Sequence, residues 1–449
     1  MKSILLLGAG MSSSSLIRYC LQQAEKFDWQ LRVCDQNIEL VRKKLGGHPR
    51  GVALNFDALN SEARRPEIEK ADLVISMLPA RFHVDVAKDC IALQTNVITP
   101  SYVSTEMNAL HQQAIDAGVL IMNEIGVDPG IDHMSACKIM DEIREKGAEI
   151  TSFKSFCGGL IAPESDNNPW NYKFTWNPRN VVLAGQGTAA AFIKNNQYKY
   201  IPYNQLFERI DRIEIDGYGV FEGYANRNSL SYRPVYKLET IPTIYRGTLR
   251  REGFCKAWNV FVSLGMTDDS YAIEASEKLT PRTFLNTFLP YSTNESIEEK
   301  FERLYAKGDK DIYHKFEWLG FFKNDEVIGL VNATPAQLLE KILVGKWVLE
   351  EGDKDMLVMH HEFEYLLEDN KYQILSSMVN LGENQIFTSM SNTVGLPVAI
   401  CAKMILNNQI SLKGVQVPVM KEVYQPILKE LEDYGITFVE KELGLERFF

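Results

Sequence analysis

The strongest constraint on the fold is an alternation of short apolar runs and amphipathic stretches over the first 130 residues. The apolar runs predict buried strands at Ile4–Leu7, Leu31–Cys34, Gly51–Leu54, Leu73–Met77, Asn96–Thr99 and Val119–Met122. The stretches between them predict helices at Ser13–Glu25, Ile38–Leu45, Ser61–Lys70, His83–Leu93 and Thr105–Ala117. Because crossovers through a helix join parallel strands and are right-handed, this part of the chain is predicted to be an α/β domain with a parallel sheet.

Beyond Gly130 the pattern changes. A long predicted helix, Ile131–Lys146, leads into β-rich runs such as Ser152–Cys157 and Arg212–Ile215, which Pro, Gly and Asn clusters separate. These runs predict a second α/β domain with a largely antiparallel sheet. Charged helical stretches between residues 280 and 345, among them Ser296–Ala306 and Pro335–Leu343, predict a small helical insertion.

The rest of the chain completes the predicted domain plan. Two strands, Met356–Glu362 and Tyr372–Leu381, are expected to return to the second domain, and two helices, Pro397–Leu406 and Lys421–Tyr434, lie in the closing segment. The predicted boundaries are residues 1–130 for the first domain, 131–279 and 346–388 for the second, 280–345 for the insertion and 389–449 for the closing segment.

Composition excludes several classes of protein. Hydrophobic residues make up 45% and charged residues 24%, as in ordinary globular proteins, and the net charge of −11 offers no basic excess for nucleic acid or an anionic membrane. The seven cysteines are scattered without a CxxC pair, so neither a disulfide framework nor a cysteine zinc site is expected. The apolar N-terminal run breaks at Gly8, and no segment approaches the roughly 20 apolar residues of a membrane span. A soluble, cytoplasmic protein is predicted.

A dinucleotide site is predicted where the first strand ends. The run Gly8-Ala9-Gly10-Met11-Ser12-Ser13 opens a helix, and its glycines allow a tight turn and a close approach of backbone to a pyrophosphate. Ser13 replaces the usual third glycine or alanine, which predicts slightly looser packing of helix on strand. The serines from Ser12 to Ser15 could cap and solvate the helix, or contact phosphate.

Asp35 ends the second predicted strand, 25 positions after Gly10. A carboxylate there would bind the ribose hydroxyls of the adenosine half and repel a 2′-phosphate, so NAD is preferred over NADP. The alternative is that Asp35 caps the following helix. Two further loops, Ser76–Pro79 and Thr99–Tyr102, end parallel strands and are candidates to flank the nicotinamide half, whereas His83 is explained at least as well by helix capping or packing as by catalysis.

The segment that joins the two main domains is rich in charge. It runs Asn123-Glu124-Ile125-Gly126-Val127-Asp128-Pro129-Gly130-Ile131-Asp132-His133. Three carboxylates and a histidine exceed what a linker needs, although Asp132 could be a helix cap and Asp128 a turn residue. Downstream, the aromatic run Asn168–Arg179 carries Lys173 and Arg179, and Arg227, Arg246 and Arg250 lie in β-rich surroundings. Converging arginines offer rigid forks for a polycarboxylate ligand, although each alone could be a surface or ion-pair residue.

Taken together, several segments resemble the glutamate-forming saccharopine dehydrogenases. They read "NEIGVDPGIDHM", "CGGLIAPE", "YKFTWNPR", "GYANRNS", "YRGTLRREGF", "KDMLVM" and "SNTVGLPVA", and the resemblance runs in order from Leu5 to about Ile436. It implies an N-terminal Rossmann domain completed by the C-terminal segment. It also implies a mixed α/β domain for substrate binding and homodimer formation, with a helical insertion. The implied reaction oxidises saccharopine with NAD or NADP to glutamate and 2-aminoadipate 6-semialdehyde, or reverses this by reductive condensation, in lysine metabolism.

The resemblance also carries site residues over to this chain. Substrate-binding positions are implied at Ser101, Tyr102, Asp128, Arg227, Thr248, Leu249 and Arg250. The implied dinucleotide positions are Gly10, Met77, Leu78, Pro79, Ser101, Ile125, Gly126, Val127 and Thr175. The glycine loop and the end of the second predicted strand add Gly8, Met11, Ser12, Ser13 and Asp35. Asp128 is the first choice for the proton acceptor, with Tyr102 and Cys157 as partners, and it would need a raised pKa to act near neutral pH. No step demands a metal.

Two departures and two alternatives accompany the resemblance. Asp35 stands where the fungal biosynthetic members carry an arginine, which favours NAD and saccharopine oxidation in lysine catabolism, and Ile161 stands where a proline is usual. One alternative is a carboxynorspermidine or carboxyspermidine dehydrogenase, which condenses an aspartate semialdehyde with a diamine. The other is a non-catalytic dinucleotide-binding sensor.

Overall fold

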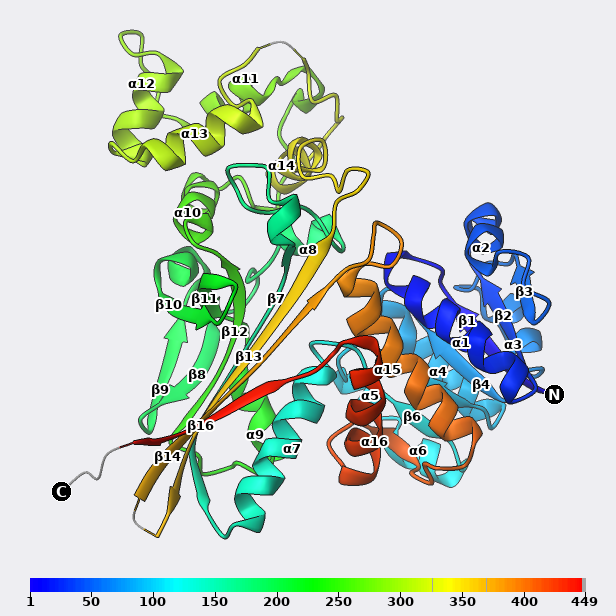
Figure 1. Ribbon diagram of the computed structural model, residues 1–449. Coiled ribbons are helices and arrows are strands. Elements are labelled where there is room, and N and C mark those ends of the chain that lie inside the picture. Colours follow the sequence, from blue (N-terminus) through cyan, green and yellow to red (C-terminus); the bar gives the residue numbers. More distant parts are fainter. Residues whose placement is uncertain (325, 369, 446–449) are drawn as a thin grey trace. The chain divides into compact units, whose positions relative to one another are not determined.

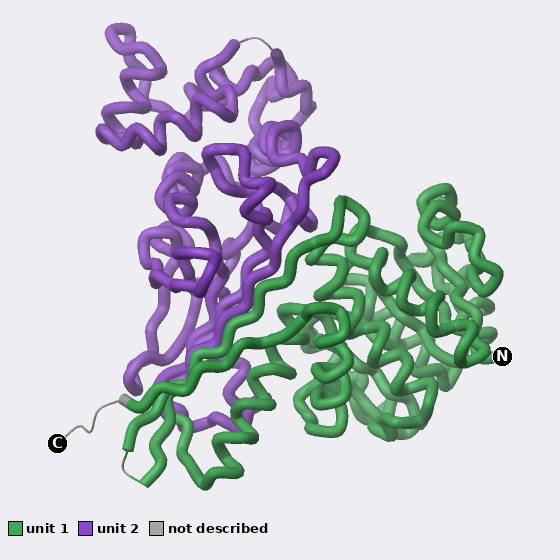
Figure 2. Tube along the Cα trace, viewed as in Figure 1, with its two compact units in different colours: residues 1–150, 364–449 green, residues 151–363 purple. Residues whose placement is uncertain are grey.

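The computed structural model describes residues 1–324, 326–368 and 370–445 (Figure 1). The chain forms two compact units, one of residues 1–150 with 364–449 and one of residues 151–363 (Figure 2). The first unit therefore takes both ends of the chain, which agrees with an N-terminal domain completed by the C-terminal segment. The finer domain boundaries given above stay a prediction.

The first unit is built on a seven-stranded parallel sheet in the order β15-β6-β5-β4-β1-β2-β3. Its strands are β1 (Lys2–Leu7), β2 (Trp29–Cys34), β3 (Gly51–Leu54), β4 (Leu73–Ser76), β5 (Asn96–Ile98), β6 (Leu120–Met122) and β15 (Gly414–Gln416). The strand order reverses direction between β1 and β4. In sheets of this kind, ligands bind beyond the carboxyl ends of the strands at such a reversal. The predicted parallel α/β domain is confirmed, and β15 extends its sheet beside β6.

Helices connect these strands. They are α1 (Ser14–Lys26), α2 (Ile38–Leu45), α3 (Ser61–Ile68), α4 (His83–Ala92), α5 (Thr105–Asn108), α6 (His111–Asp116), α7 (Ile131–Glu145), α15 (Ser389–Leu406) and α16 (Lys421–Leu431). The single helix predicted for Thr105–Ala117 is wrong, because a turn at Ala109 and Leu110 divides it. That turn places Leu110 in the same buried cluster as Met107 and Ala114.

Helix α15 begins eight residues before the predicted Pro397, which lies inside it. The polar start of this helix hid it from the apolar pattern, but these side chains are buried and paired. The Thr388 side chain caps the helix at Ser391 N–H, and the backbone nitrogen of Ser15 in α1 donates to Ser391 Oγ at 2.9 Å. Helix α15 is long and apolar enough to cross a membrane, but 83% of it is buried inside the protein, as in the core helix of a globular domain.

A second, nine-stranded sheet follows the order β10-β11-β12-β7-β13-β14-β16, with β8 beside β12 and β9 beside β8. Its strands are β7 (Glu149–Ile161), β8 (Ala190–Lys194), β9 (Gln197–Ile201), β10 (Ile210–Ile215), β11 (Gly219–Ala225), β12 (Thr243–Arg251), β13 (Asp355–Leu367), β14 (Asn370–Leu381) and β16 (Val439–Leu445). The sheet is mixed, since β12 pairs with β7 in parallel and with β11 antiparallel. Strand β16 was not predicted, because its charged sequence lacks an apolar run.

The second unit also contains the helical part of the chain. Short helices α8 (Pro178–Val182) and α9 (Tyr232–Val235) and the apolar α10 (Phe254–Leu264) accompany its strands. Between α10 and β13 lie α11 (Pro281–Phe288), α12 (Ile297–Phe301), α13 (Lys310–Leu319) and α14 (Pro335–Val344), the predicted helical segment (Figure 1). The fold class predicted from the sequence, a parallel-sheet domain with a mixed α/β domain, is the one observed.

Candidate active site

The glycine loop between β1 and α1 has the geometry of a phosphate-binding turn. Gly8 has a φ of +101°, and a Cβ added to it would lie 3.0 Å from the carbonyl oxygen of Met77, so both conformation and space demand glycine. A Cβ added at Gly10 would meet nothing within 4 Å, which leaves its backbone open to a ligand. The Ser13 hydroxyl donates to Gly10 O at 2.8 Å and so ties the loop, while the looser packing of helix on strand stays a prediction.

Lys44 of α2 forms hydrogen bonds with the same loop. Its ammonium donates to Gly10 O at 2.6 Å and to Ser13 Oγ at 3.2 Å. Burial lowers the pKa of Lys44 to about 8, although nearby Asp35 acts in the opposite direction. Of the two alternatives for the serine run, solvation does not apply to Ser15, which is fully buried and donates to Asn392 Oδ1 at 2.6 Å. This serine therefore fixes α1 to α15.

A pocket of about 320 Å³ lies beside the glycine loop, where an adenosine would be expected. Its walls include Gly8, Asp35, Asp57, Leu78, Pro79 and Arg81. Asp35 accepts hydrogen bonds from Ala9 N at 2.8 Å and from Asn37 N at 2.9 Å. The cap of α2 is Asn37, whose side chain accepts from Leu40 N, so the alternative of Asp35 as the helix cap is wrong. Asp35 instead presents its carboxylate at the pocket wall.

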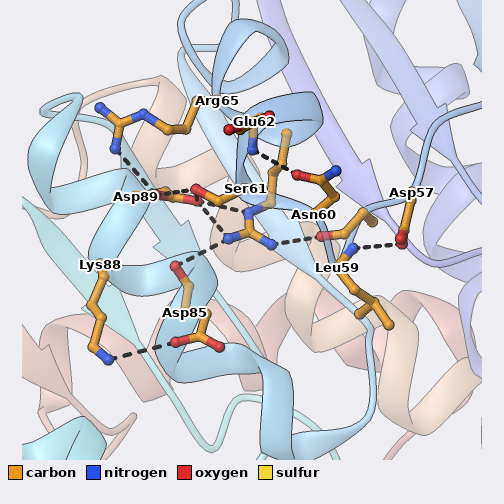
Figure 3. Close-up of polar contacts among 11 residues, drawn as sticks. Asp57, Leu59, Asn60, Ser61, Glu62, Arg65, Asp85, Lys88 and Asp89 are labelled. Carbon is orange, nitrogen blue, oxygen red and sulfur yellow. Dashed lines mark hydrogen bonds and ion pairs between the residues drawn. The ribbon is translucent and has the colours of Figure 1, made fainter.

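The wall of this pocket at Ala58 rests on a buried ion pair between Arg64 and Asp89, and Figure 3 labels Asp89 with its partners Ser61 and Arg65. The Arg64 side chain in α3 is 2% exposed and donates through Nε to Asp89 Oδ2 at 3.0 Å and through Nη1 to the carbonyl oxygen of Ala58 at 2.6 Å. Asp89 in α4 also accepts from Ser61 Oγ at 2.8 Å and from Arg65 Nη1 at 3.2 Å. Because Ala58 itself lines the pocket, this network fixes the pocket's shape.

We expect Asp89→Asn to lower the free energy of unfolding by about 3–5 kcal/mol, since it leaves the buried Arg64 cation without its counter-charge. Asp85→Asn is the matched control. Asp85 lies one turn earlier in the same helix, and its carboxylate pairs with Lys88 at 3.5 Å on the surface (Figure 3), so its loss should cost about 1 kcal/mol or less. Urea denaturation of both variants measures the difference. Equal losses would contradict a structural role for the buried pair.

The loops after β5 and β6 carry a second group of the predicted site residues. The Tyr102 hydroxyl donates to Asp128 Oδ1 at 3.1 Å, so the structure brings these two predicted residues together. Glu124, which the sequence did not single out, joins the loop after β5 to the start of α7. Its backbone N–H donates to Ser101 O at 3.1 Å, its Oε1 accepts from Val103 N at 2.9 Å, and its Oε2 lies 2.7 Å from His133 Nε2.

Neighbouring residues of the same segment are packed tightly. Ile125, Gly126 and Val127, the implied dinucleotide positions, are buried, whereas Asp128 is half-buried. Asp132 accepts from Gly130 N at 2.6 Å, but it lies inside the first turn of α7, whose N-cap is Gly130 and has no side-chain cap hydrogen bond. Asp128 therefore lies among buried neighbours of its own segment, and Tyr102 contacts it from the loop after β5.

In the second unit, three adjacent strands position the predicted substrate residues. Thr248 of β12 lies opposite Cys157 of β7 and opposite Tyr224 of β11. Cys157 is 8% exposed, and the Thr175 hydroxyl is buried without a hydrogen-bond partner among the described residues. Ile161, which stands where a proline is usual, is the buried last residue of β7.

Arg250 is the most unusual charge in this unit. It is 4% exposed, and its guanidinium carbon lies 5.1 Å from the ring centroid of Tyr172, 5.5 Å from that of Phe254 and 5.8 Å from that of Tyr224. Its Nη1 donates to Leu249 O at 2.8 Å, but its Nε has no partner among the described residues, and none of their carboxylates forms an ion pair with it. Buried charges are normally paired, so this site has the character of an anion receptor.

Electrostatics keep Arg250 charged and its neighbours neutral. Burial lowers the pKa of Arg250, but the phenols of Tyr224 and Tyr172 and the thiols of Cys255 and Cys157 raise it by more, leaving a cation at neutral pH. Burial raises the pKa of Tyr224 to about 12 and also raises that of Tyr172, in each case against the pull of Arg250. Both phenols therefore keep their protons near neutral pH and can donate hydrogen bonds.

The other basic candidates have different surroundings. Arg227 is exposed, with a φ of +40°, and the Arg246 guanidinium lies 4.0 Å from the ring centroid of Tyr232. Lys173 forms a buried ion pair with Asp353, and Arg179 pairs with Asp269 and Glu340. These last two are therefore ion-pair residues. The burial of Arg250 among aromatic side chains could not be read from a strand whose sequence, TIYRGTLRR, ends in charge.

Together, the glycine loop, the reversal of strand order and the pocket beside the loop are those of a Rossmann-type dinucleotide-binding protein. Two family models cover almost the whole chain. "Saccharopine dehydrogenase NADP binding domain" matches residues 4–122 and "Saccharopine dehydrogenase C-terminal domain" matches residues 126–436. The chain belongs to the saccharopine dehydrogenase family, whose members are nicotinamide-dependent oxidoreductases acting on the CH–NH group of donors.

Individual relatives match over nearly the whole of this chain. The Pyricularia oryzae protein named saccharopine dehydrogenase [NADP(+), L-glutamate-forming] is 34% identical, over 98% of this chain and 99% of its own. The mitochondrial alpha-aminoadipic semialdehyde synthase of Bos taurus is 33% identical over 97% of this chain but only 47% of its own. The solved apo structure of the L-Glu-forming saccharopine dehydrogenase from Saccharomyces cerevisiae matches with a TM-score of 0.89 and 31% identity, covering 99% of this chain and 100% of that one.

The comparisons bear on the cofactor only in part. The names of the matching domain and of the fungal relatives support a nicotinamide dinucleotide, and they name NADP rather than NAD. The predicted preference for NAD therefore has no support from these names.

Proposed function

We propose that this chain is a glutamate-forming saccharopine dehydrogenase that interconverts saccharopine with glutamate and 2-aminoadipate 6-semialdehyde. The observation that carries the proposal is Arg250, a buried cation without a carboxylate partner among the described residues, in a member of this family. Saccharopine carries three carboxylates, and the Arg250 guanidinium would bind one of them with the neutral phenols of Tyr172 and Tyr224 beside it. Arg227 is a second, exposed contact in the proposal.

The proton chemistry belongs to the turn that carries Asp128. Its carboxylate would accept the proton of the substrate's secondary amine, while the Tyr102 hydroxyl, 3.1 Å away, holds the carboxylate in place. A bound nicotinamide would take up the hydride from the carbon next to that nitrogen. The same carboxylate could then activate the water that hydrolyses the resulting imine. Ser101 and Cys157 are further contacts, and Thr248 and Leu249 complete the substrate positions.

The test is reduced-nicotinamide absorbance after mixing the purified protein with saccharopine and NAD or NADP. Turnover with saccharopine is the expected result. Tight binding of NADH without turnover of saccharopine, with activity on a diamine and an aspartate semialdehyde instead, would overturn the proposal in favour of a polyamine-forming enzyme. We also propose that the enzyme is a cytoplasmic homodimer that oxidises saccharopine in lysine catabolism.

We further propose that Asp35 makes NAD the preferred cofactor. Its carboxylate lies on the adenosine pocket wall with Asp57, where a 2′-phosphate would meet negative charge. We expect Asp35→Asn, which keeps a hydrogen-bond acceptor and removes the charge, to raise kcat/KM with NADP relative to NAD by roughly ten- to a hundredfold. Steady-state assays with both cofactors measure the ratio, and Glu39→Gln on the exposed face of α2 is the control. A wild-type enzyme faster with NADP would contradict the proposal.

A further inference from the structure

His83, the first residue of α4, lies in a ring of three hydroxyl groups at the carboxyl edge of the parallel sheet. Its Nδ1 is 2.9 Å from Ser76 Oγ at the end of β4. Its Nε2 is 2.8 Å from Ser101 Oγ and 3.1 Å from Thr99 Oγ1, both just beyond β5. The imidazole is 4% exposed, so it joins a fully buried serine to one of the residues proposed to touch the ligands.

Burial keeps this imidazole neutral. Desolvation lowers the pKa of His83 to about 4, so near neutral pH the ring has one N–H donor and one nitrogen acceptor. Helix capping does not explain the arrangement, because no side chain caps α4 and both ring nitrogens face side-chain hydroxyls. The remaining question is which nitrogen carries the proton.

The hydrogen bonds of the surrounding hydroxyls decide which nitrogen carries the proton. With the proton on Nε2, the Ser76 hydroxyl donates to Nδ1 and Nε2 donates to Ser101, and of the buried hydroxyls only Thr99 lacks an acceptor among the described residues. With the proton on Nδ1, that nitrogen donates to Ser76, whose own hydroxyl proton then has no acceptor among the described residues. Across the short 2.8 Å contact Ser101 donates to Nε2, so the Thr99 hydroxyl proton also has no acceptor among them. Buried hydroxyl protons without acceptors are costly, so the first arrangement is favoured.

We infer that His83 is a positioning residue, held as the Nε2–H tautomer by Ser76, which orients the Ser101 hydroxyl as a hydrogen-bond donor to a ligand oxygen. Because the Ser101 oxygen accepts from the imidazole, its own proton is available to a carboxylate or carboxamide oxygen of the bound ligand. This inference rests on the proposed function for its ligand, but the tautomer itself is a property of the resting protein.

The first test is nitrogen NMR of the protein labelled with ¹⁵N-histidine, without ligands. The His83 signals are assigned by their loss in His83→Gln. We expect Nε2 to be protonated and Nδ1 unprotonated near neutral pH. Ser76→Ala, which removes the donor to Nδ1, should shift both ring signals toward a mixture of tautomers, and Ser104→Ala, which removes only the cap of α5, should leave them unchanged. A protonated Nδ1 in the wild-type protein would overturn the inference.

The second test is a double-mutant cycle with Ser76→Ala and Ser101→Ala. Within the described part of the chain Ser76 and Ser101 form no hydrogen bond with each other and both bond to His83, so coupling between them must pass through the imidazole. We expect Ser76→Ala to lower kcat/KM for saccharopine about three- to tenfold in the wild-type background and less than about twofold in the Ser101→Ala background. Additive effects would overturn the positioning role. A wild-type protein that does not turn over saccharopine would overturn the proposed function, and the NMR result on the tautomer would stand.

Discussion

Asp128→Asn is expected to lower kcat for saccharopine oxidation by roughly 10²–10⁴-fold, with a much smaller change in KM, because a carboxamide cannot accept the proton of the substrate amine. The amide is nearly isosteric and can still accept the hydrogen bond that Tyr102 donates to Asp128 at 3.1 Å, so the turn should keep its shape. Steady-state kinetics over a range of pH measure the effect. A base must be deprotonated to act, so the fall of kcat toward acid pH in the wild-type enzyme should disappear in the variant.

The control is Asp116→Asn, which changes an exposed carboxylate in α6 that contacts only Gln112 in the described hydrogen bonds. It should leave kcat and KM unchanged. If Asp128→Asn instead raised KM for saccharopine and preserved kcat, Asp128 would be an electrostatic anchor for the substrate amine. The assignment of the base would then move to another group.

The sequence predicted the first unit well because its signals are local. Strand β3 and helix α2 have the predicted bounds, and β1, β2 and β4 differ from theirs by a few residues at one end. In each case an apolar run, a glycine or a capping residue lies within the element itself. The polar start of α15 and the whole of β16 were missed for the opposite reason. Their polar groups form hydrogen bonds with α1 and β14, which lie far away in sequence.

The candidate site shows the same contrast between local signals and contacts that form only after folding. Asp35, Asp128 and Tyr102 could be named as candidates because each stands at a position that a motif or strand end defines. The brace of Glu124 against His133 and the hydroxyls around His83 could not, since they depend on which side chains meet after folding. Burial is the property that sequence reveals least.

Arg250→Met is expected to separate function from stability. It should lower kcat/KM for saccharopine by about 30- to 5,000-fold, the cost of leaving a buried ligand carboxylate without its cation. The same change should leave the free energy of unfolding within about 1 kcal/mol of wild type or raise it, because in the free protein Arg250 is a buried cation without a carboxylate partner among the described residues. Steady-state kinetics and urea denaturation measure the two effects.

Arg251→Met is the matched control, since Arg251 is the next residue of β12 and a strand directs successive side chains to opposite faces. Its guanidinium donates to Tyr218 O and lies 4.5 Å from the ring centroid of Phe221. Its loss should therefore affect stability more than kcat/KM. If Arg250→Met destabilised the protein and left kcat/KM intact, Arg250 would be a structural cation held by its aromatic rings. Loss of activity with stability preserved would mean that the folded chain maintains an uncompensated charge because the substrate supplies its partner.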